Sequence, residues 1–98
     1  METAIIFDLL RPFVGYHIVF TNGYEQDCVS IDTTAFDSIF LDSGRLTEGG
    51  TRTGYYVMPH NVNSAEWKGN TLRLIGNNCS GAIIRLHRIE VSNAEETT

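Results

Sequence analysis

The sequence predicts an all-β fold, a small antiparallel β-sandwich or jelly roll of about seven short strands. Apolar and polar residues alternate over short runs, and Gly, Asn and Pro residues separate those runs. No run combines a helical period with helix caps. A chain of 98 residues has room for one modest core. We therefore expect one sandwich domain over residues 1–91 and a polar, disordered tail over residues 92–98.

The first predicted strand covers residues 4–10. Ile5, Phe7 and Leu9 occupy alternate positions, as they would on one face of a strand. The run is short and lacks the caps that would favour a helix. A turn containing Pro and Gly follows it.

A hairpin comes next. Residues 16–20 alternate, and Asn22-Gly23 is the dipeptide best suited to a tight hairpin turn. Residues 28–33 also alternate, which predicts a strand with Val29 and Ile31 pointing inward.

Two more strands are expected in the middle of the chain, at residues 36–41 and 55–58. Pro59 ends the second of them because it cannot donate a ladder hydrogen bond. We interpret residues 59–68 as a loop.

The last third contains two further strands and a bulge. We expect the strands at residues 71–75 and 82–86, around a loop at residues 76–81. Ile84 and Leu86 share one face, whereas Ile89 and Val91 have the opposite parity. One extra residue near His87-Arg88 would reconcile them, which predicts a β-bulge there.

Residues 69–91 carry a family resemblance. They read Gly-Asn-Thr-Leu-Arg-Leu-Ile-Gly and, after a short loop, Gly-Ala-Ile-Ile-Arg-Leu-His-Arg-Ile-Glu-Val. This segment resembles the closing strands of galactose-binding-like jelly rolls, which include many carbohydrate-binding modules. The resemblance implies a non-catalytic module that binds glycans from loops at one end. The architecture also resembles the tip domains of phage tail fibres and other virion attachment proteins.

Composition and motifs argue against several functions. The net charge of −5 disfavours nucleic-acid binding. The chain has no GxSxG, HExxH or P-loop motif, and His17, His60 and His87 lie in no catalytic signature. So small a core can hardly shape a deep cleft. We expect no enzymatic activity.

The N-terminal residues and the cysteines bear on where the protein acts. The start is acidic, Asp8 interrupts its apolar run, and no stretch approaches the roughly 20 apolar residues of a membrane span. We expect no signal peptide and no membrane insertion, so the chain would be cytosolic, part of a particle, or a module from a longer secreted protein.

Cys28 and Cys79 match no metal spacing. Free thiols are favoured, and a disulfide stays open.

Four acids recur at intervals of five residues: Asp27, Asp32, Asp37 and Asp42. Calcium binds several oxygen ligands from loops, and jelly-roll modules that resemble this chain often carry a structural calcium. A spacing of five, however, puts successive residues on opposite faces of a strand. Solvated acids are therefore the default interpretation, with no cofactor expected.

A basic face is expected near the C-terminus. Arg73, Arg85 and Arg88 lie in a segment without acids, and pairing of the last two strands would place Arg73 beside Arg85. We favour pairing with the acidic N-terminal strands inside the fold. The alternatives are a site for an anion or acidic sugar, or a surface for self-association.

The candidate binding surface lies between Tyr55 and Asn70, where aromatic and amide side chains surround the expected loop. Sugars stack their apolar faces on aromatic rings and bond their hydroxyls to planar polar groups. The alternative is that Trp67, the single Trp, is a core residue. The hairpin-tip Tyr would extend the surface if it lies at the same end. The candidate ligand-binding residues are Trp67, Tyr56, His60, Asn61, Asn63 and Tyr24.

The leading hypothesis is a non-catalytic module that binds a glycan or cell-surface receptor, with homo-oligomers supplying avidity. One alternative is a virion or particle structural protein that acts through homo-oligomer assembly. Another is a small intracellular inhibitor or adaptor that binds a host protein.

Overall fold

The computed structural model describes residues 1–77 and 79–89. Helix α1 spans Thr3–Leu10, and the 3₁₀ turns η1 and η2 span Arg11–Phe13 and Pro59–Asn61. The strands are β1 (Tyr16–Phe20), β2 (Glu25–Cys28), β3 (Ser30–Thr33), β4 (Ile39–Leu46), β5 (Arg52–Val57), β6 (Val62–Lys68), β7 (Thr71–Gly76) and β8 (Cys79–Arg88).

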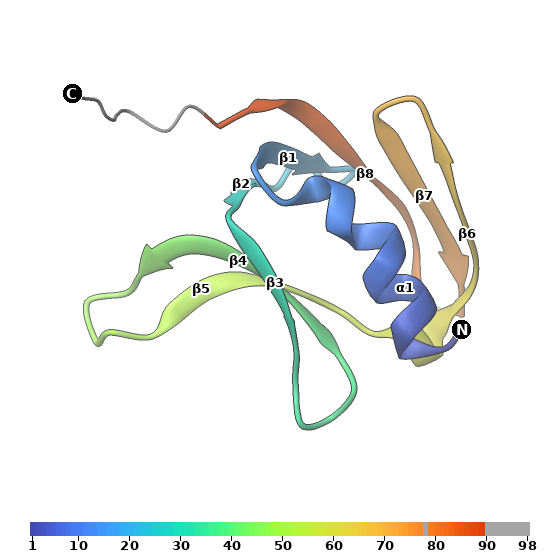
Figure 1. Cartoon of the computed structure of the whole chain (residues 1–98), viewed down its shortest axis with the longest axis horizontal. Coiled ribbons are helices and arrows are strands. Elements are labelled where there is room, and N and C mark those ends of the chain that lie inside the picture. The colour runs from blue at the N-terminus through green and yellow to red at the C-terminus, as the bar shows by residue number, and fades with distance from the viewer. Residues whose placement is uncertain (78, 90–98) are drawn as a thin grey trace.

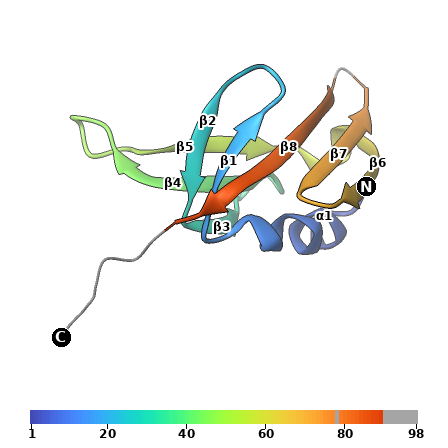
Figure 2. The same cartoon turned by 90° about the horizontal axis from the view of Figure 1, so that it is seen from above.

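The strands form two antiparallel sheets, which confirms the predicted small all-β sandwich. One sheet has the order β2-β1-β8-β7-β6, and the other has the order β3-β4-β5. Figure 1 shows the elements, and Figure 2 shows the strands of the two sheets crossing, with α1 on the far side from the turn between β1 and β2. Strand β2 packs near β4, and α1 packs near β6, β3 and η2.

The predicted strand over residues 4–10 is wrong, because this segment forms α1. Its buried residues are Ile6 and Leu10, followed by Phe13 in η1. Their spacing of four and then three residues is that of one helix face. Ile5, one of the residues whose alternation predicted a strand, lies on the exposed side of the helix. Tertiary packing favours a helix over a strand in this segment, because the helix covers core side chains that the two small sheets alone would leave exposed to solvent.

The core brings together apolar residues from α1, η1 and both sheets. The five-stranded sheet contributes residues such as Ile18, Leu72 and Ile83, and the three-stranded sheet contributes Ile39 and Leu41. All five side chains are almost fully buried. The sandwich therefore has a single core that the helix closes.

The hairpin prediction is confirmed. Strands β1 and β2 pair antiparallel, and Gly23 between them has a φ of +91°. The Asn22 side-chain oxygen accepts a 2.9 Å hydrogen bond from the Tyr24 amide. Asn thus stabilises the turn through its side chain, and Gly adopts the left-handed conformation without a Cβ penalty.

The predicted strand over residues 28–33 is divided in two. Cys28 ends β2, Ser30 begins β3, and the chain crosses from one sheet to the other at Val29. Val29 is exposed, so its predicted inward orientation is wrong, whereas Ile31 packs against the core. The local alternation could not reveal that the strand changes partner.

The predicted loop over residues 59–68 is also wrong. Only η2 is irregular, and β6 follows it directly. The register against β7 shifts between Val62 and Ser64, so Asn63 is an extra, exposed residue. This bulge puts Val62 and Trp67, at positions of opposite parity, on the inner side of the sheet.

The predicted bulge in the last strand is present, one residue earlier than expected. His17 pairs with His87 and Ile18 with Arg85, so Leu86 is the extra residue. Among the described side chains of β8, Ile83 is buried. Val91 and the predicted tail at residues 92–98 lie outside the described residues. Among those described, no helix has both the length and the apolar character to cross a membrane.

Candidate functional site

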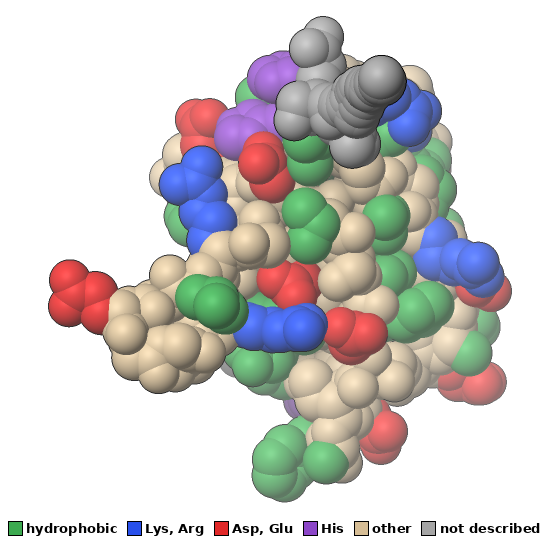
Figure 3. Space-filling view, turned by 60° about the vertical axis from the view of Figure 1, so that its left-hand side comes forward, with side chains coloured by type: hydrophobic (Ala, Val, Ile, Leu, Met, Phe, Trp, Pro, Cys, Tyr) green, Lys and Arg blue, Asp and Glu red, His purple; other side chains and the backbone are tan. Residues whose placement is uncertain are grey.

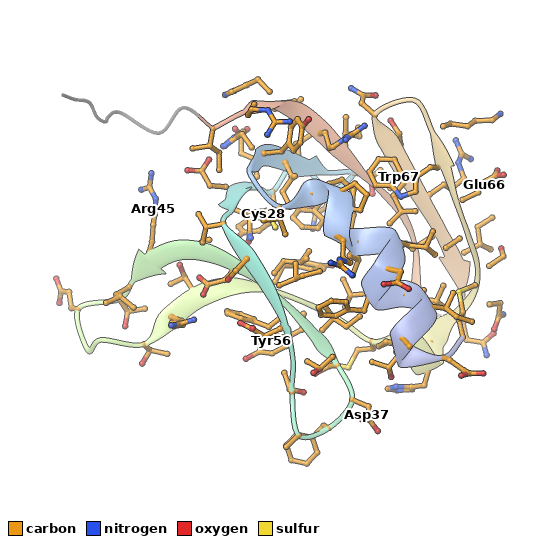
Figure 4. The ribbon with its side chains drawn as sticks, in the orientation of Figure 1. Cys28, Asp37, Arg45, Tyr56, Glu66 and Trp67 are labelled. Atoms are coloured by element: carbon orange, nitrogen blue, oxygen red, sulfur yellow. The ribbon has the colours of Figure 1, made fainter. Side chains whose placement is uncertain are left out.

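The structure does not gather the predicted ligand-binding residues into one site. Trp67 lies on β6 in the five-stranded sheet, and Tyr56 lies on β5 in the other sheet. Figure 4 shows them well separated, with Tyr56 beside the three-stranded sheet and Trp67 near α1 and β6. His60 and Asn61 form part of η2.

Trp67 packs against the core. Its indole Nε1 donates a 2.8 Å hydrogen bond to the Leu9 carbonyl at the end of α1. Its ring lies 4.8 Å from that of Phe13, and the Arg85 guanidinium lies 4.8 Å from its centroid. These contacts occupy the indole group, which supports the core interpretation of Trp67.

The other residues of the predicted binding surface lie in different parts of the structure. The Tyr56 ring packs 4.8 Å from Phe40 on the outer face of the three-stranded sheet. Asn63 is the bulge residue of β6. His60 lines a hollow of about 500 Å³ together with N-terminal residues of the chain and Asp37. No described contact joins these side chains to Trp67.

The predicted basic face is also divided. Arg73 pairs with Ala82 and Leu72 with Ile83, so Arg73 projects from the outer face while Arg85 shares the inner face with Ile83. The expectation that Arg73 and Arg85 lie side by side is therefore wrong. Arg73 is exposed, and none of the described acids forms an ion pair with Arg73 or Arg85.

Arg85 instead belongs to a ladder of stacked groups. Its guanidinium lies over Tyr16 at 4.9 Å and over Trp67 at 4.8 Å, and the guanidinium of Arg88 lies over Tyr16 at 4.8 Å. Arg88 also donates a 2.9 Å hydrogen bond to the Tyr16 hydroxyl. The Tyr and Trp rings thus replace the acidic partners expected for these arginines.

A different set of polar side chains does converge, at the junction of the two sheets. They surround a hollow of about 270 Å³, which we call the polar hollow. Figure 3 shows histidine, acidic and basic side chains gathered on one side of the molecule, over this region. The residues of the polar hollow are His17, Tyr24, Glu25, Gln26, Asp27, Ser43, Arg45 and Thr53.

An aromatic stack adjoins the polar hollow. The ring of Tyr24 lies 5.5 Å from Phe20 and 6.2 Å from Tyr55, and the rings of Phe20 and Tyr55 are 4.2 Å apart. Tyr24 is 41% exposed and Tyr55 is 38% exposed. Two aromatic residues from the predicted surface are therefore brought together, by the hairpin turn and β5, with Phe20 linking them to the core.

His17 is held between two acids on one wall of the polar hollow. Its Nδ1 lies 2.6 Å from an Asp27 carboxylate oxygen, and its Nε2 lies 2.8 Å from a Glu25 carboxylate oxygen. The hydrogen bond to Asp27, followed by that to Glu25, raises the pKa of His17 above its usual 6.5. The ring of His87 stacks on His17 with centroids 5.3 Å apart.

The inner end of the polar hollow is built from satisfied polar groups. The Tyr24 hydroxyl donates to the Gln26 side-chain oxygen at 2.8 Å, and the Gln26 amide nitrogen donates to the buried Leu41 carbonyl at 2.9 Å. The Ser43 hydroxyl lies 2.6 Å from that of Thr53. These hydrogen bonds fix the orientation of Tyr24 and of the inner polar groups.

Arg45 lies on the opposite wall. Figure 4 shows its side chain projecting from β4 away from the three-stranded sheet. It forms no ion pair with an acid of the described residues. The guanidinium therefore stays available to an external acceptor, whereas Glu25 and Asp27 already share His17.

Cys28 contributes no reactive group to this region. Cys28 is a buried free thiol, and burial, with a further contribution from the Asp42 carboxylate, raises its pKa to about 12. A thiol with such a pKa is a poor nucleophile near neutral pH. The side chain of Cys79 lies outside the described part of the chain.

The four regularly spaced aspartates do not converge. Asp27 bonds His17, Asp32 is exposed on β3, and Asp37 lies in the turn before β4. Asp42 is buried, where it accepts hydrogen bonds from the Gly44 amide and the Arg52 guanidinium. Across residues 1–77 and 79–89, no group of three or more His, Cys, Asp or Glu side chains is placed to hold a metal ion.

Comparisons with protein-family models, with curated proteins and with solved structures found no match to this chain.

The sequence contained a partial signal for the polar hollow. The Asn22-Gly23 dipeptide indicated a hairpin that brings β2 beside β1. A two-residue turn would set His17 opposite Cys28, whereas a loop of three residues separates the hydrogen-bonded Phe20 and Tyr24 and sets His17 opposite Asp27. Arg45 and Thr53 carried no such signal, because they come from the other sheet.

Proposed function

We propose that this chain is a non-catalytic recognition module that binds a glycan in the polar hollow. One observation carries the proposal: the exposed Tyr24–Tyr55 stack adjoins a wall of planar polar side chains. Rings accept the apolar faces of sugars, and carboxylate, amide and guanidinium groups bond sugar hydroxyls. The resemblance of residues 69–91 to closing strands of galactose-binding-like modules supports the same ligand class.

The size of the hollow supports a short ligand. Its volume of about 270 Å³ falls just below the roughly 300–1,000 Å³ of drug-sized pockets. The fitting ligand is one or two sugar units, or the end of a longer chain. Affinity at one such site is expected to be weak, so repeated sites would supply avidity.

The charges favour an acidic sugar. Arg45 has no acidic partner among the described residues, and His17, when protonated, neutralises part of the charge of Glu25 and Asp27. A sugar carboxylate would then bond Arg45 while its hydroxyls face the other wall. The anion or acidic-sugar site first considered around Arg73 and Arg85 is thus better placed at Arg45.

The same groups support a non-catalytic role. Both ring nitrogens of His17 already face carboxylates, and the Ser43 hydroxyl is bonded to Thr53. A nucleophile activated by a histidine needs those two groups within hydrogen-bonding reach. The virion-attachment and host-adaptor hypotheses stay predictions, because no described feature bears on them.

A glycan array with neutral and acidic oligosaccharides, followed by NMR titration of the labelled protein with the best binder, tests the proposal. We expect amide shifts at residues 24–27 and 43–45. Replacing Tyr24 with Ala should weaken binding about fivefold, because aromatic stacking contributes about 1 kcal/mol. The matched control is Phe36→Ala, which removes a ring that is 88% exposed and outside the polar hollow.

Arg45→Gln tests the preference for acidic sugars. It should weaken binding of an acidic sugar and leave a neutral sugar nearly unaffected, and Arg73→Gln should affect neither. Absence of any binder on the array, or equal losses in Tyr24→Ala and Phe36→Ala, would contradict the proposal.

A further inference from the structure

The two sheets end in four edge strands, β2, β6, β3 and β5, as far as the described residues show. An edge strand exposes unpaired backbone N–H and C=O groups that can pair with another strand. Proteins protect such edges with charges, bulges or very short strands. The four edges of this chain differ in that protection.

Three edges are protected. Strand β2 has four residues, with Glu25 and Asp27 among them, and the four-residue β3 contains Asp32. Strand β6 contains two charged residues, Glu66 and Lys68, as well as the bulge at its start. Each of these edges combines charge with shortness or irregularity.

Strand β5 has such protection only at its start, where it carries Arg52 and where its register with β4 shifts. Its other residues are Thr53, Gly54, Tyr55, Tyr56 and Val57, which carry no charge. This stretch pairs regularly with β4 on one side, from the Asp42–Gly54 pair to the Ile39–Val57 pair. Figure 1 shows β5 at the border of its sheet.

The side chains along β5 are also unusually apolar for an exposed edge. Tyr56 is 54% exposed on the outer face, where it stacks on Phe40. Tyr55 is partly exposed on the inner side. Aromatic pairs across neighbouring strands stabilise sheets, so both faces of this edge offer contacts to an added strand.

We propose that a second copy of this chain pairs its own β5 antiparallel with this one across a twofold axis. The arrangement is isologous, so one edge supplies both halves of the interface. A twofold through Tyr55 sets Gly54 opposite Tyr56 and Thr53 opposite Val57, which places small residues opposite larger ones. No like charges meet within this stretch.

Charge favours β5 over the other edges for self-pairing. The same operation about Gln26 of β2 would set Glu25 opposite Asp27, and like charges directly opposite each other are unfavourable. The overall charge of −5 on each copy still opposes association at long range, and salt screens that repulsion. The β5 pair should therefore form more tightly at high salt than at low salt.

This surface adjoins the proposed glycan site, because Thr53 and Tyr55 belong to both, but its test needs no glycan. Sedimentation equilibrium of the full chain should show a monomer–dimer equilibrium that added sodium chloride tightens. Tyr56→Lys places two like charges at the interface and should raise the dimer dissociation constant at least about tenfold. Thr33→Lys, on the exposed edge of β3, is the matched control and should leave it unchanged.

Hydrogen exchange provides a measurement on the unmodified protein. Amide exchange in β5 should slow as protein concentration rises, whereas exchange in β3 should not change. A strictly monomeric chain, a Tyr56→Lys variant that dimerises as the wild type does, or β5 amides insensitive to concentration would each overturn the proposal. A dimer that salt dissociates would also do so, because it would be held by ion pairs.

Discussion

Replacing Trp67 separates the contribution of its hydrogen bond from that of its packing. The indole donates to the Leu9 carbonyl at 2.8 Å, packs at a tilt against the Phe13 ring and lies under Arg85. The hydrogen bond contributes about 1 kcal/mol. The Phe13 stack contributes about 0.5–1.5 kcal/mol, and the contact with Arg85 about 0.5–1 kcal/mol.

These contributions predict a graded series of variants. Trp67→Phe keeps an aromatic ring and removes the donor, so it should lower the free energy of unfolding by about 1–2 kcal/mol. Trp67→Ala also loses the stacking and leaves a cavity, so it should cost about 3–5 kcal/mol. For a domain of this size, each kcal/mol corresponds to roughly 4–8 °C in melting temperature.

Urea unfolding followed by far-UV circular dichroism measures the series, because Trp fluorescence is lost in both variants. Phe36→Ala is the control for removing an exposed ring and should cost no more than about 0.5 kcal/mol. If Trp67→Ala cost no more than Phe36→Ala, Trp67 would not be a core residue. If Trp67→Phe matched the wild type, the hydrogen bond to Leu9 would contribute nothing measurable.

Two further predictions concern stability. Gly76→Ala should cost at least about 2 kcal/mol in urea unfolding, because its Cβ would overlap the Asn61 carbonyl oxygen. Gly49→Ala, whose Cβ would meet the Thr47 hydroxyl at an ordinary contact distance of 3.9 Å, should be nearly neutral, and equal costs would refute the steric explanation. The pKa of His17 is raised in the folded state, mainly by Asp27, so its stabilising contribution is full below about pH 6 and is lost as pH rises through the folded pKa. The stability difference between wild type and His17→Gln, measured by urea unfolding, should therefore shrink from pH 5.5 to pH 8.5, and a difference that grows would contradict the assigned partners.

The fold shows where sequence patterns succeed. The alternation of apolar and polar residues within β1, β7 and most of β8 predicted these strands. It is a local property, because successive side chains of a strand point to opposite faces. Gly23 stabilises its turn through a positive φ that few other residues adopt, and Asn22 does so through its side-chain hydrogen bond. The opposite parity of two apolar pairs predicted the bulge near the end of β8, although the structure buries Ile83 of this strand and leaves Leu86 exposed.

The errors share a physical cause. Ile5, Phe7 and Leu9 fit a strand, but packing over the open side of the sheets stabilises α1, in which Ile6 and Leu10 are buried instead. Tertiary context overrides weak local preference in so short a segment. The bulge at Asn63 likewise interrupts the alternation of side chains along β6, so the sequence predicted a loop there instead of a strand.

The candidate site depends still more on tertiary structure. Trp67 was predicted as a binding residue because Trp suits sugar binding, yet its indole bonds the Leu9 carbonyl and packs against the core. The polar hollow joins residues from β1, β2, β4 and β5, and Arg45 lies far in sequence from His17. No local sequence pattern indicates that Arg45 and His17 line the same hollow.

The sequence by itself determined the all-β class, the antiparallel hairpins and the absence of recognisable catalytic motifs, because these follow from side-chain alternation, turn chemistry and residue type. Only the tertiary structure decided which aromatic rings are buried, which arginines stack on rings, and which polar side chains surround one hollow. Those outcomes depend on how the two sheets and α1 pack together. Packing depends on contacts between distant residues, and a single sequence read locally does not contain them.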